Sequence, residues 1–317
     1  MLTIVRGELK ILKIALPLSS AYLLISHGSR DPRPHQAMER LAEQVRSQLE
    51  TRRWRQGEPG GIQYMHFLNS PLSQPLVPNQ ELLPINRDGS FQANRVLQRA
   101  EAKPVTPTVV SRKCQYPLVG TATLELADTP LHEQIRQFAR TAVAGACNQI
   151  QLLPLFLLPG VHVREDIPAE VALAQRDLGE AVVLNMRPHV GDHPGLGRLL
   201  VSQWSGVDTD AKILLSHGSR RVGGNQPVEA VAQELGAVAA YWSVQPTLEE
   251  QIKVLVARGH KRIGILPYFL FPGGITDAIA QKLDILQTEF PTLKLTLGEP
   301  IGTTDILANL IVDLIEP

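Results

Sequence analysis

One pentapeptide occurs twice in this chain of 317 residues, each time directly after an apolar run. Residues 26–30 and residues 216–220 both read Ser-His-Gly-Ser-Arg. A second pair of segments follows in the same order, Pro-Leu-Phe-Leu-Leu-Pro-Gly at 154–160 and Pro-Tyr-Phe-Leu-Phe-Pro-Gly at 267–273. Two motifs repeated in one order indicate an internal duplication, so we expect the two halves of the chain to share one fold.

The apolar runs predict parallel β-sheets, because Val, Ile and Leu follow one another in them as is typical of strands buried on both faces. In the first half we expect strands at 22–26, 118–125, 150–154 and 181–185, and helices at 36–50, 130–146 and 166–178. In the second half we expect strands at 212–216, 237–242, 262–267 and 293–297, and helices at 227–235, 247–258, 276–287 and 303–315. This alternation predicts an α/β protein with two homologous, doubly wound parallel-sheet lobes.

The first half carries an insertion that the second half lacks. Residues 51–116 are rich in Pro, Asn, Gln and Arg, are basic on balance and have little periodicity. They are typical of a surface loop or a disordered segment, so deleting about Arg55–Arg112 is expected to leave the fold intact. The alternative is a lid or a docking segment for an acidic partner.

The chain is accordingly divided into four parts. We expect an N-terminal extension at 1–20, lobe 1 at 21–190 with its insertion at about 51–116, a connecting region rich in Pro and Gly at 191–210, and lobe 2 at 211–317.

Composition excludes several classes of protein. Lysine plus arginine equals aspartate plus glutamate, 31 each, which argues against a nucleic-acid partner. Neither Cys114 nor Cys147 lies in a Cys-x-x-Cys pair, so zinc-ribbon and iron–sulfur sites are poorly supported. The sequence has no apolar stretch of membrane-spanning length and no typical secretory signal, so a cytoplasmic protein without a membrane partner is expected.

Polar side chains follow successive strands of the predicted first sheet. His27 follows the first strand, Glu125 ends the second and His162 comes just after the third. The carboxyl ends of parallel strands meet at one edge of a sheet, where ligands bind in open α/β folds. Each residue alone has an ordinary structural explanation, but two imidazoles and a carboxylate at one edge predict a divalent-metal site with open coordination positions.

The second half keeps only part of this set. His217 matches His27, whereas counting from the neighbouring Pro residues aligns Tyr241 with Glu125 and Ile275 with His162. A single histidine is a poor metal site, so we expect the site of lobe 2 to be degenerate. Its Ser-His-Gly-Ser-Arg segment is then expected to be a retained turn, in which Gly allows the tight bend and Ser can cap the next helix.

Other polar residues have structural interpretations. Asp166-Ile167-Pro168 has the pattern of a helix N-cap followed by Pro in the first turn, which would help to aim the loop of His162. His189 and His193 lie in a Pro- and Gly-rich segment and indicate a helix start.

Three segments carry a resemblance to a known family. Residues 26–32 (SHGSRDP), 124–131 (LELADTPL) and 154–168 (PLFLLPGVHVREDIP) resemble the motifs of the sirohydrochlorin chelatases, which are class II tetrapyrrole chelatases. The spacing in the third segment is the most specific of the three. The long form of that family has two fused chelatase-like, flavodoxin-like lobes, so the resemblance implies an active cleft between the lobes.

The resemblance also implies an activity and residue roles. Members insert cobalt or ferrous iron into sirohydrochlorin on the way to cobalamin or sirohaem; the metal ion is a substrate and no tightly bound cofactor is implied. The family's catalytic and metal-binding residues match His27, His162 and Glu125. Because the macrocycle carries many carboxylates, cationic and polar groups at the cleft rim are expected to bind it. The candidates are Ser29, Arg30, Arg33 and Arg164, with Arg220 or Arg221 from the facing lobe.

The residues leave other functions open. A non-catalytic metal or tetrapyrrole carrier could use the same fold, and a small-molecule hydrolase could use His27 and Ser29, although Ser29 lies outside a Gly-x-Ser-x-Gly elbow. Cobalt, ferrous iron and nickel all suit a His and Glu donor set, so the metal stays open too. A monomer is expected, because two fused lobes supply what a shorter homologue would assemble as a dimer.

Overall fold

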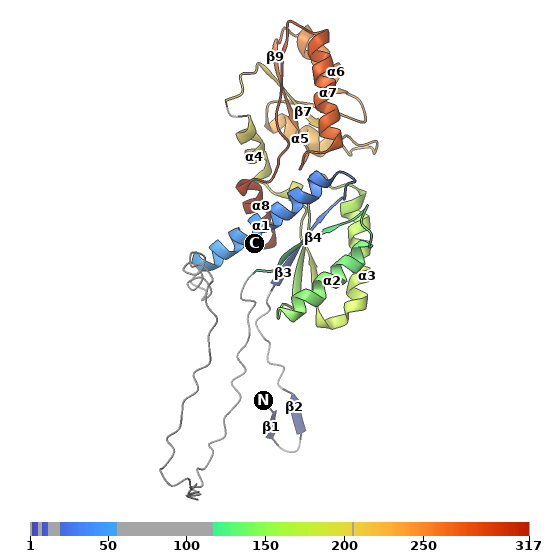
Figure 1. Cartoon of the computed structure of the whole chain (residues 1–317), viewed down its shortest axis with the longest axis vertical. Coiled ribbons are helices and arrows are strands. Elements are labelled where there is room, and N and C mark those ends of the chain that lie inside the picture. Colours follow the sequence, from blue (N-terminus) through green and yellow to red (C-terminus); the bar gives the residue numbers. More distant parts are fainter. Residues whose placement is uncertain (1, 6–7, 12–19, 56–116, 205, 317) are drawn as a thin grey trace, which may run out of the picture. The chain divides into compact units, whose positions relative to one another are not determined.

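The computed structural model of the chain describes residues 2–5, 8–11, 20–55, 117–204 and 206–316 (Figure 1). Near the N-terminus, strands β1 (Leu2–Val5) and β2 (Glu8–Ile11) pair antiparallel as a separate two-stranded sheet. Residues 56–116 of the predicted insertion lie outside the described residues, so the interpretations of that segment stay predictions.

Each half of the chain forms a four-stranded parallel sheet. Both sheets have the same order, with the first strand between the second and the third and the fourth strand at the edge. The strands of lobe 1 are β3 (Ser20–Ser26), β4 (Val119–Thr123), β5 (Gln149–Pro154) and β6 (Val183–Met186). The strands of lobe 2 are β7 (Ala211–Ser216), β8 (Val238–Tyr241), β9 (Arg262–Pro267) and β10 (Lys294–Leu297). The predicted α/β fold with two homologous doubly wound lobes is confirmed.

Helices follow the strands in both lobes. They are α1 (Pro32–Arg55), α2 (Leu131–Ala144), α3 (Ile167–Leu178), α4 (Leu196–Gln203), α5 (Gln226–Glu234), α6 (Leu248–Ala257), α7 (Gly274–Glu289) and α8 (Asp305–Ile315). Three short helical turns complete the described elements: the π-helical turn η1 (His162–Asp166) and the 3₁₀ turns η2 (Gly179–Ala181) and η3 (Val190–Asp192).

The central strands are apolar on both faces because helices cover both faces. In β3, Leu23 and Ile25 pack with residues of α2 and α3, whereas Tyr22 and Leu24 face α1 on the other side. The same arrangement recurs in lobe 2, where α6 and α7 cover one face of the sheet. This two-sided burial explains why the strands read as continuous apolar runs in the sequence.

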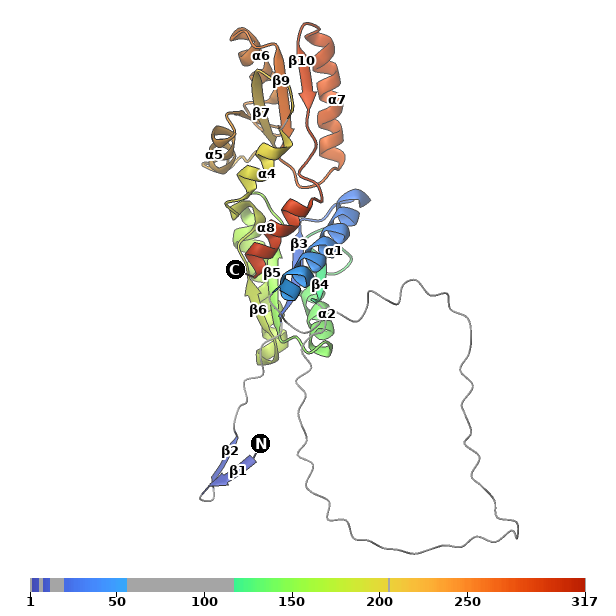
Figure 2. The ribbon, with the colours of Figure 1, turned by 90° about the vertical axis from the view of Figure 1, so that its left-hand side faces the viewer.

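The last helix of each half packs on the other lobe. Helix α8 lies against α1 and β5 of lobe 1 (Figure 2). Helix α4 makes the reverse exchange: the Trp204 ring that follows it covers Gly264 of β9, where a Cβ atom would overlap the indole. Leu199 and Leu200 of α4 and Leu307 and Ile311 of α8 therefore lie in one core shared by both lobes.

Helices α1 and α4 differ from the predicted elements. Helix α1 continues to Arg55, beyond the predicted end at 50 and into the segment assigned to the insertion. Arg52 pairs with Asp313 and Arg53 lies 3.9 Å from Glu316, so contacts with α8 support the additional turn. Helix α4 was not predicted in the connecting region 191–210. Among the described residues, no helix is both long and apolar enough to cross a membrane.

Candidate metal centre

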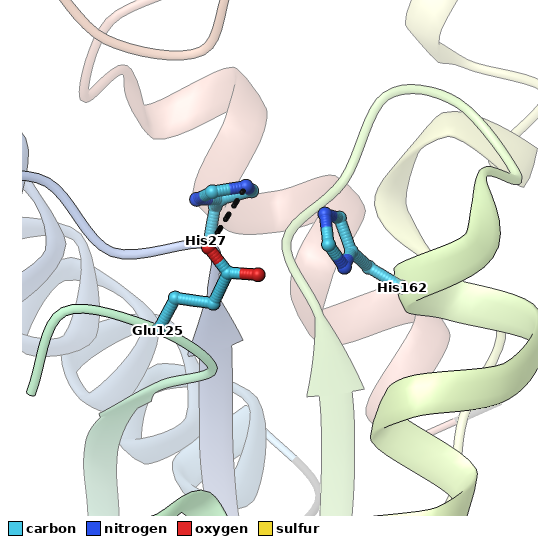
Figure 3. A group of neighbouring side chains, drawn as sticks. All are labelled: His27, Glu125 and His162. Carbon is cyan, nitrogen blue, oxygen red and sulfur yellow. Dashed lines mark ion pairs between the residues drawn. The ribbon is translucent and has the colours of Figure 1, made fainter.

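Three predicted ligands lie at the carboxyl edge of the lobe 1 sheet (Figure 3). His27 directly follows β3, which lies between β4 and β5. Glu125 comes two residues after the end of β4, and His162 begins the η1 turn that follows β5. The strand order therefore brings together side chains that are far apart in the sequence, as expected for the switch point of a doubly wound sheet.

The side chains are within reach of one ion. The Nε2 atom of His27 lies 3.9 Å from Oε2 of Glu125. The rings of His27 and His162 meet edge to face, with centroids 4.8 Å apart and planes at 86°. One donor atom from each residue lies within 4.8 Å of those of the other two. Typical metal–nitrogen and metal–oxygen distances are about 2.0–2.2 Å, so small side-chain rotations would place all three donors on one divalent ion.

The backbone fixes the relative position of His27 and Glu125. The Glu125 N–H donates to the His27 carbonyl oxygen at 2.8 Å. Gly28 has φ +103°, and a Cβ atom there would overlap the Glu125 carbonyl oxygen. A glycine is therefore required at this turn both for its dihedral angle and for the close approach of the two chains.

The carboxylate of Asp166, whose sequence pattern predicts a helix N-cap, contacts the ring of His162 instead. Oδ2 of Asp166 lies 2.7 Å from Nδ1 of His162. Asp166 has helical backbone angles and its side chain caps no helix, so the predicted N-cap role is wrong. The π-helical hydrogen bond from the Ile167 N–H to the His162 carbonyl oxygen instead makes Asp166 part of the same turn. A carboxylate at Nδ1 leaves Nε2 of His162 available as a ligand.

A cleft of about 1010 Å³ opens beside His27 and is lined by both lobes. From lobe 1 it is lined by the loops after β3 and β4 and the start of α1; from lobe 2 by His217, by the segment after β9 and by the start of α7. Lobe 1 contributes Ser26, His27, Gly28, Ser29, Asp31, Pro32, Pro34, His35, Met38, Thr121, Ala122, Thr123, Leu126, Ala127, Asp128, Thr129, Gln134 and Leu155. A cleft of this volume is large enough for a sizeable small-molecule ligand.

The corresponding edge of lobe 2 lacks the other ligands. The Ser243 N–H donates to the His217 carbonyl oxygen, as the Glu125 N–H does to the His27 carbonyl oxygen. Ser243 is therefore the residue of lobe 2 that matches Glu125. The predicted match with Tyr241 is therefore wrong, because the loop before Pro246 is two residues shorter than the loop before Pro130. Tyr241 instead lies in β8, where burial raises its pKa to about 12.

The predicted substrate-binding residues lie around the first turn of α1 and in η1. Ser29 and Arg30 are exposed on the loop after β3, and Arg164 is exposed in η1. Ser29 Oγ accepts the Asp31 N–H at 3.0 Å. Arg221 of lobe 2 lies 3.7 Å from Glu165, which belongs to the same turn η1.

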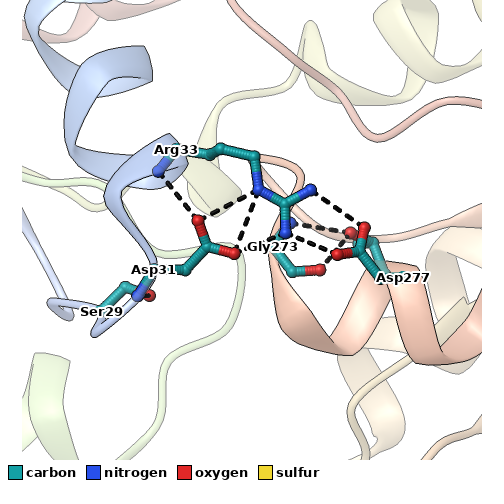
Figure 4. A network of polar contacts seen from close by, with 6 residues as sticks. Ser29, Asp31, Arg33, Gly273 and Asp277 are labelled. Atoms are coloured by element: carbon teal, nitrogen blue, oxygen red, sulfur yellow. Dashed lines mark hydrogen bonds and ion pairs between the residues drawn. The ribbon is translucent and has the colours of Figure 1, made fainter.

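Arg33 is held by carboxylates from both lobes (Figure 4). Its Nε donates to Asp31 at 3.0 Å, and its terminal nitrogens donate to the two oxygens of Asp277 at 3.0 and 2.6 Å. These hydrogen bonds from Arg33 hold the pKa of the Asp31 and Asp277 carboxyls below their usual range. Most donors of Arg33 are therefore already used within the protein.

Comparison with known proteins agrees with this architecture. The sequence model of the CbiX family matches the chain twice, at residues 97–206 and 211–317. These two matches cover more than half of the chain, and they include Glu125 and His162 but not His27.

Among characterised relatives, sirohydrochlorin ferrochelatase of Priestia megaterium is 23% identical over 238 residues, which cover 71% of this chain and 83% of the relative. Sirohydrochlorin cobaltochelatase of the same organism is 24% identical over 201 residues, covering 58% and 64%. The crystal structure of the sirohydrochlorin chelatase SirB from Bacillus subtilis subspecies spizizenii in complex with cobalt shares the fold, with a TM-score of 0.60, 16% identity and 94% of both chains covered. With both halves matched by one family model, the chain belongs to the CbiX family.

Proposed function

We propose that this protein inserts a divalent metal ion into sirohydrochlorin and takes the ion, cobalt or ferrous iron, as a substrate. The observation that carries the proposal is the meeting of His27, Glu125 and His162 beside a cleft lined by both lobes. Relatives named sirohydrochlorin ferrochelatase and sirohydrochlorin cobaltochelatase support the choice of macrocycle.

The donor set suits an ion that must be released after binding. Two imidazoles and one carboxylate leave coordination positions open, which the ring nitrogens of a macrocycle could occupy in turn. Insertion of M²⁺ replaces the two pyrrole N–H protons, so the products are the metallated macrocycle and two protons. As the ion leaves, His27, His162 and Glu125 become able to accept these protons.

The Asp166 carboxylate favours the tautomer of His162 that carries its proton on Nδ1. With its carboxylate 2.7 Å from Nδ1, the proton of the neutral ring is held at Nδ1 and the lone pair of Nε2 is left for the ion. This contact supports His162 as a ligand whose Nε2 is unprotonated before the metal ion binds.

The rim of the cleft is proposed to bind the carboxylates of the macrocycle. Arg30 follows His27 by three residues and Arg164 follows His162 by two, and both arginines are exposed. Ser29 lines the cleft. Guanidinium groups bind carboxylates with charge-assisted, often bidentate hydrogen bonds. Arg33 is proposed to act through its ion pair with Asp277, since that carboxylate occupies its terminal nitrogens.

A metallation assay tests the proposal. Purified protein is mixed with sirohydrochlorin and either Co²⁺ or anaerobic Fe²⁺, and the change in absorbance of the macrocycle is followed against a control without protein. We expect faster metallation with protein, and the side-by-side rates identify the preferred metal. Protein that binds sirohydrochlorin but leaves the rate at the control value would instead be a carrier.

Substitutions test the residue assignments. His27→Ala and His162→Ala are each expected to remove most of the activity and weaken Co²⁺ binding, because each removes one of the three candidate ligands. His217→Ala is the matched control, since His217 lies at the equivalent position in lobe 2 and belongs to no such cluster among the residues that the structure describes. Equal losses for His27→Ala and His217→Ala would mean that both lobes bind metal.

A further inference from the structure

The two walls of the cleft differ in chemistry. Lobe 2 contributes Phe269, Leu270, Phe271 and Ile275, which we call the apolar wall, together with His217, Gly273, Gly274 and Thr276. None of these lining residues is a lysine, arginine, aspartate or glutamate. Ile275 is 39% exposed although it is a large apolar side chain. Counting from the repeated Pro-Gly pair aligns it in sequence with His162. In this cleft lobe 2 therefore presents an apolar surface, and lobe 1 presents His27.

Leu126 is unusual on the facing side of the cleft. It directly follows Glu125, lines the cleft, is 58% exposed and has φ +60°. A left-handed backbone is unfavourable for a residue with a branched side chain, and exposure of that side chain adds a second cost. Strain of this kind persists at functional sites, where it has a use that the fold alone does not explain.

Ala146 is a residue whose left-handed backbone conformation has a structural explanation. Ala146 and Leu126 are the residues other than glycine that have positive φ among those that the structure describes. Ala146 follows the end of α2, where the Cys147 N–H donates to the Ala142 carbonyl oxygen and closes the helix. Leu126 lies in a loop and ends no helix, so its conformation has no such explanation.

We propose that Leu126 and the apolar wall hold the flat ring of the tetrapyrrole between them, and so position its nitrogens for the ion at His27, Glu125 and His162. This inference rests on the proposed function. A tetrapyrrole is planar, with π-faces that favour apolar contact and carboxylates confined to its rim. Ser243 and Ile275 replace two ligands of lobe 1, so the second lobe is specialised to bind the ring rather than the metal.

Binding of metal-free sirohydrochlorin tests this role directly. The affinity of the full-length protein for the macrocycle is measured by absorbance titration without metal, for Leu126→Asn and for Ile275→Thr. Each variant removes apolar contact area, so we expect roughly tenfold weaker binding. The Co²⁺ affinity, measured by calorimetry without the macrocycle, is expected to stay at the wild-type value.

Matched controls separate the ring contact from general effects. Ile285→Thr makes the same change on the same helix α7 at a side chain that is 54% exposed and outside the cleft lining. Ala146→Asn introduces the same residue at the other left-handed position, and asparagine tolerates this conformation better than most residues. Both controls are expected to bind sirohydrochlorin like the wild type, and both asparagine variants are expected to keep or raise the Tm.

The outcomes distinguish this inference from the proposed function. If the wild type binds and metallates sirohydrochlorin but Leu126→Asn and Ile275→Thr bind it equally well, the ring contact is refuted and the proposed function stands. If Leu126→Asn weakens Co²⁺ binding as much as macrocycle binding, Leu126 acts through Glu125 and the inference is again refuted. A wild type that neither binds nor metallates the macrocycle refutes the proposed function itself.

Discussion

The Asp166 carboxylate contacts Nδ1 of His162 at 2.7 Å and leaves Nε2 for the candidate metal site. In Asp166→Asn the charge at Nδ1 is lost and the ring tautomer is no longer fixed. Such partners of metal-binding histidines typically contribute roughly 10- to 100-fold in metal affinity, so a loss in this range is expected from Co²⁺ titration. Glu165→Gln is the matched control, because Glu165 lies on the same turn and faces Arg221 instead. An unchanged Co²⁺ affinity in Asp166→Asn would remove Asp166 from the site.

Gly28 is expected to tolerate no side chain. In Gly28→Ala the new Cβ would overlap the Glu125 carbonyl oxygen, and the positive φ adds further strain. We expect a loss of at least about 1 kcal/mol in the free energy of unfolding, together with weaker Co²⁺ binding as His27 and Glu125 separate.

Gly160→Ala provides the comparison for this prediction, because a Cβ atom at Gly160 meets nothing within 4 Å. Chemical denaturation and Co²⁺ titration of both variants check it. Equal stability of the two variants would show that the close approach at Gly28 can relax without cost.

The candidate ligands could be predicted because their positions depend only on strand order. His27, Glu125 and His162 each follow a strand that the apolar runs reveal, and parallel strands bring their carboxyl ends together. The contact of Asp166 could not be predicted, because it depends on a π-helical turn at a position where the sequence pattern indicates an ordinary helix start. The His-x-x-x-Asp spacing at the start of the helix that follows β5 is the available signal. The match between Ser243 and Glu125 could not be predicted by counting back from Pro246, because the loop before Pro246 is two residues shorter than the loop before Pro130.

The short turn η3 is capped by the side chain of the buried His189. Nδ1 of the buried His189 accepts the Asp192 N–H at 3.1 Å, which confirms the predicted helix-start role. Burial lowers the pKa of His189 below the usual 6.5, against the opposing effect of Asp192 and with a smaller lowering by Arg164. The folded state therefore binds fewer protons than the unfolded state. This contribution to stability is complete above pH 6.5 and is lost as the pH falls through the lower pKa of the folded protein.

The expected result is a free energy of unfolding that decreases from about pH 7.5 to about pH 5.5, and a smaller decrease in His189→Gln. Glutamine keeps an acceptor for the Asp192 N–H but does not titrate. The measurement is urea denaturation at both pH values, with His35→Gln as the control because the His35 side chain is 62% exposed. A decrease of the same size in wild type and His189→Gln would assign the pH dependence to other groups.

Most elements could be predicted because packing follows the periodicity of the sequence. Strand β9 was predicted with its observed bounds, 262–267, and the other strands differ by a few residues. Helix α4 was missed because Gly195 and Gly197 are typical of a linker. In the structure Gly197 instead allows a close contact with Glu234 of α5, where a Cβ atom would overlap the carboxylate. The exchanged position of α4 and α8 depends on contacts between distant segments, which periodicity does not report.

The whole molecule combines two similar lobes that contribute different residues to one cleft. The exchange of α4 and α8 gives the lobes a common core, in which Leu199 and Ile311 take part. Such a core makes it difficult for one lobe to move or unfold without the other. The duplicated fold places the candidate ligands His27, Glu125 and His162 at one sheet edge. The cleft beside His27 is lined on the side of lobe 2 by apolar residues such as Ile275.

The ion pair between Arg33 and Asp277 joins the two lobes at this cleft. Arg33 lies in the first turn of α1 and Asp277 in the first turn of α7, and the neighbouring Asp31 and Thr276 line the cleft. Because Arg33 keeps the pKa of the Asp277 carboxyl below its usual 3.8, this carboxylate is charged at every pH above that value. The contribution of the pair is therefore present in neutral solution and is lost only as the pH falls below 3.8.

Two variants decide whether Arg33 holds the lobes or the substrate. If the ion pair sets the width of the cleft, Arg33→Gln and Asp277→Asn each raise the KM for sirohydrochlorin several-fold with little change in kcat. The double variant is then no worse than either single variant, because both remove one interaction. If Arg33 binds substrate carboxylates directly, Asp277→Asn releases its guanidinium and lowers the KM, whereas Arg33→Gln raises it. We expect the first pattern, because both oxygens of Asp277 accept hydrogen bonds from Arg33. The difference in KM between each variant and the wild type should also shrink at high salt, because the ion pair is partly exposed and salt screens it.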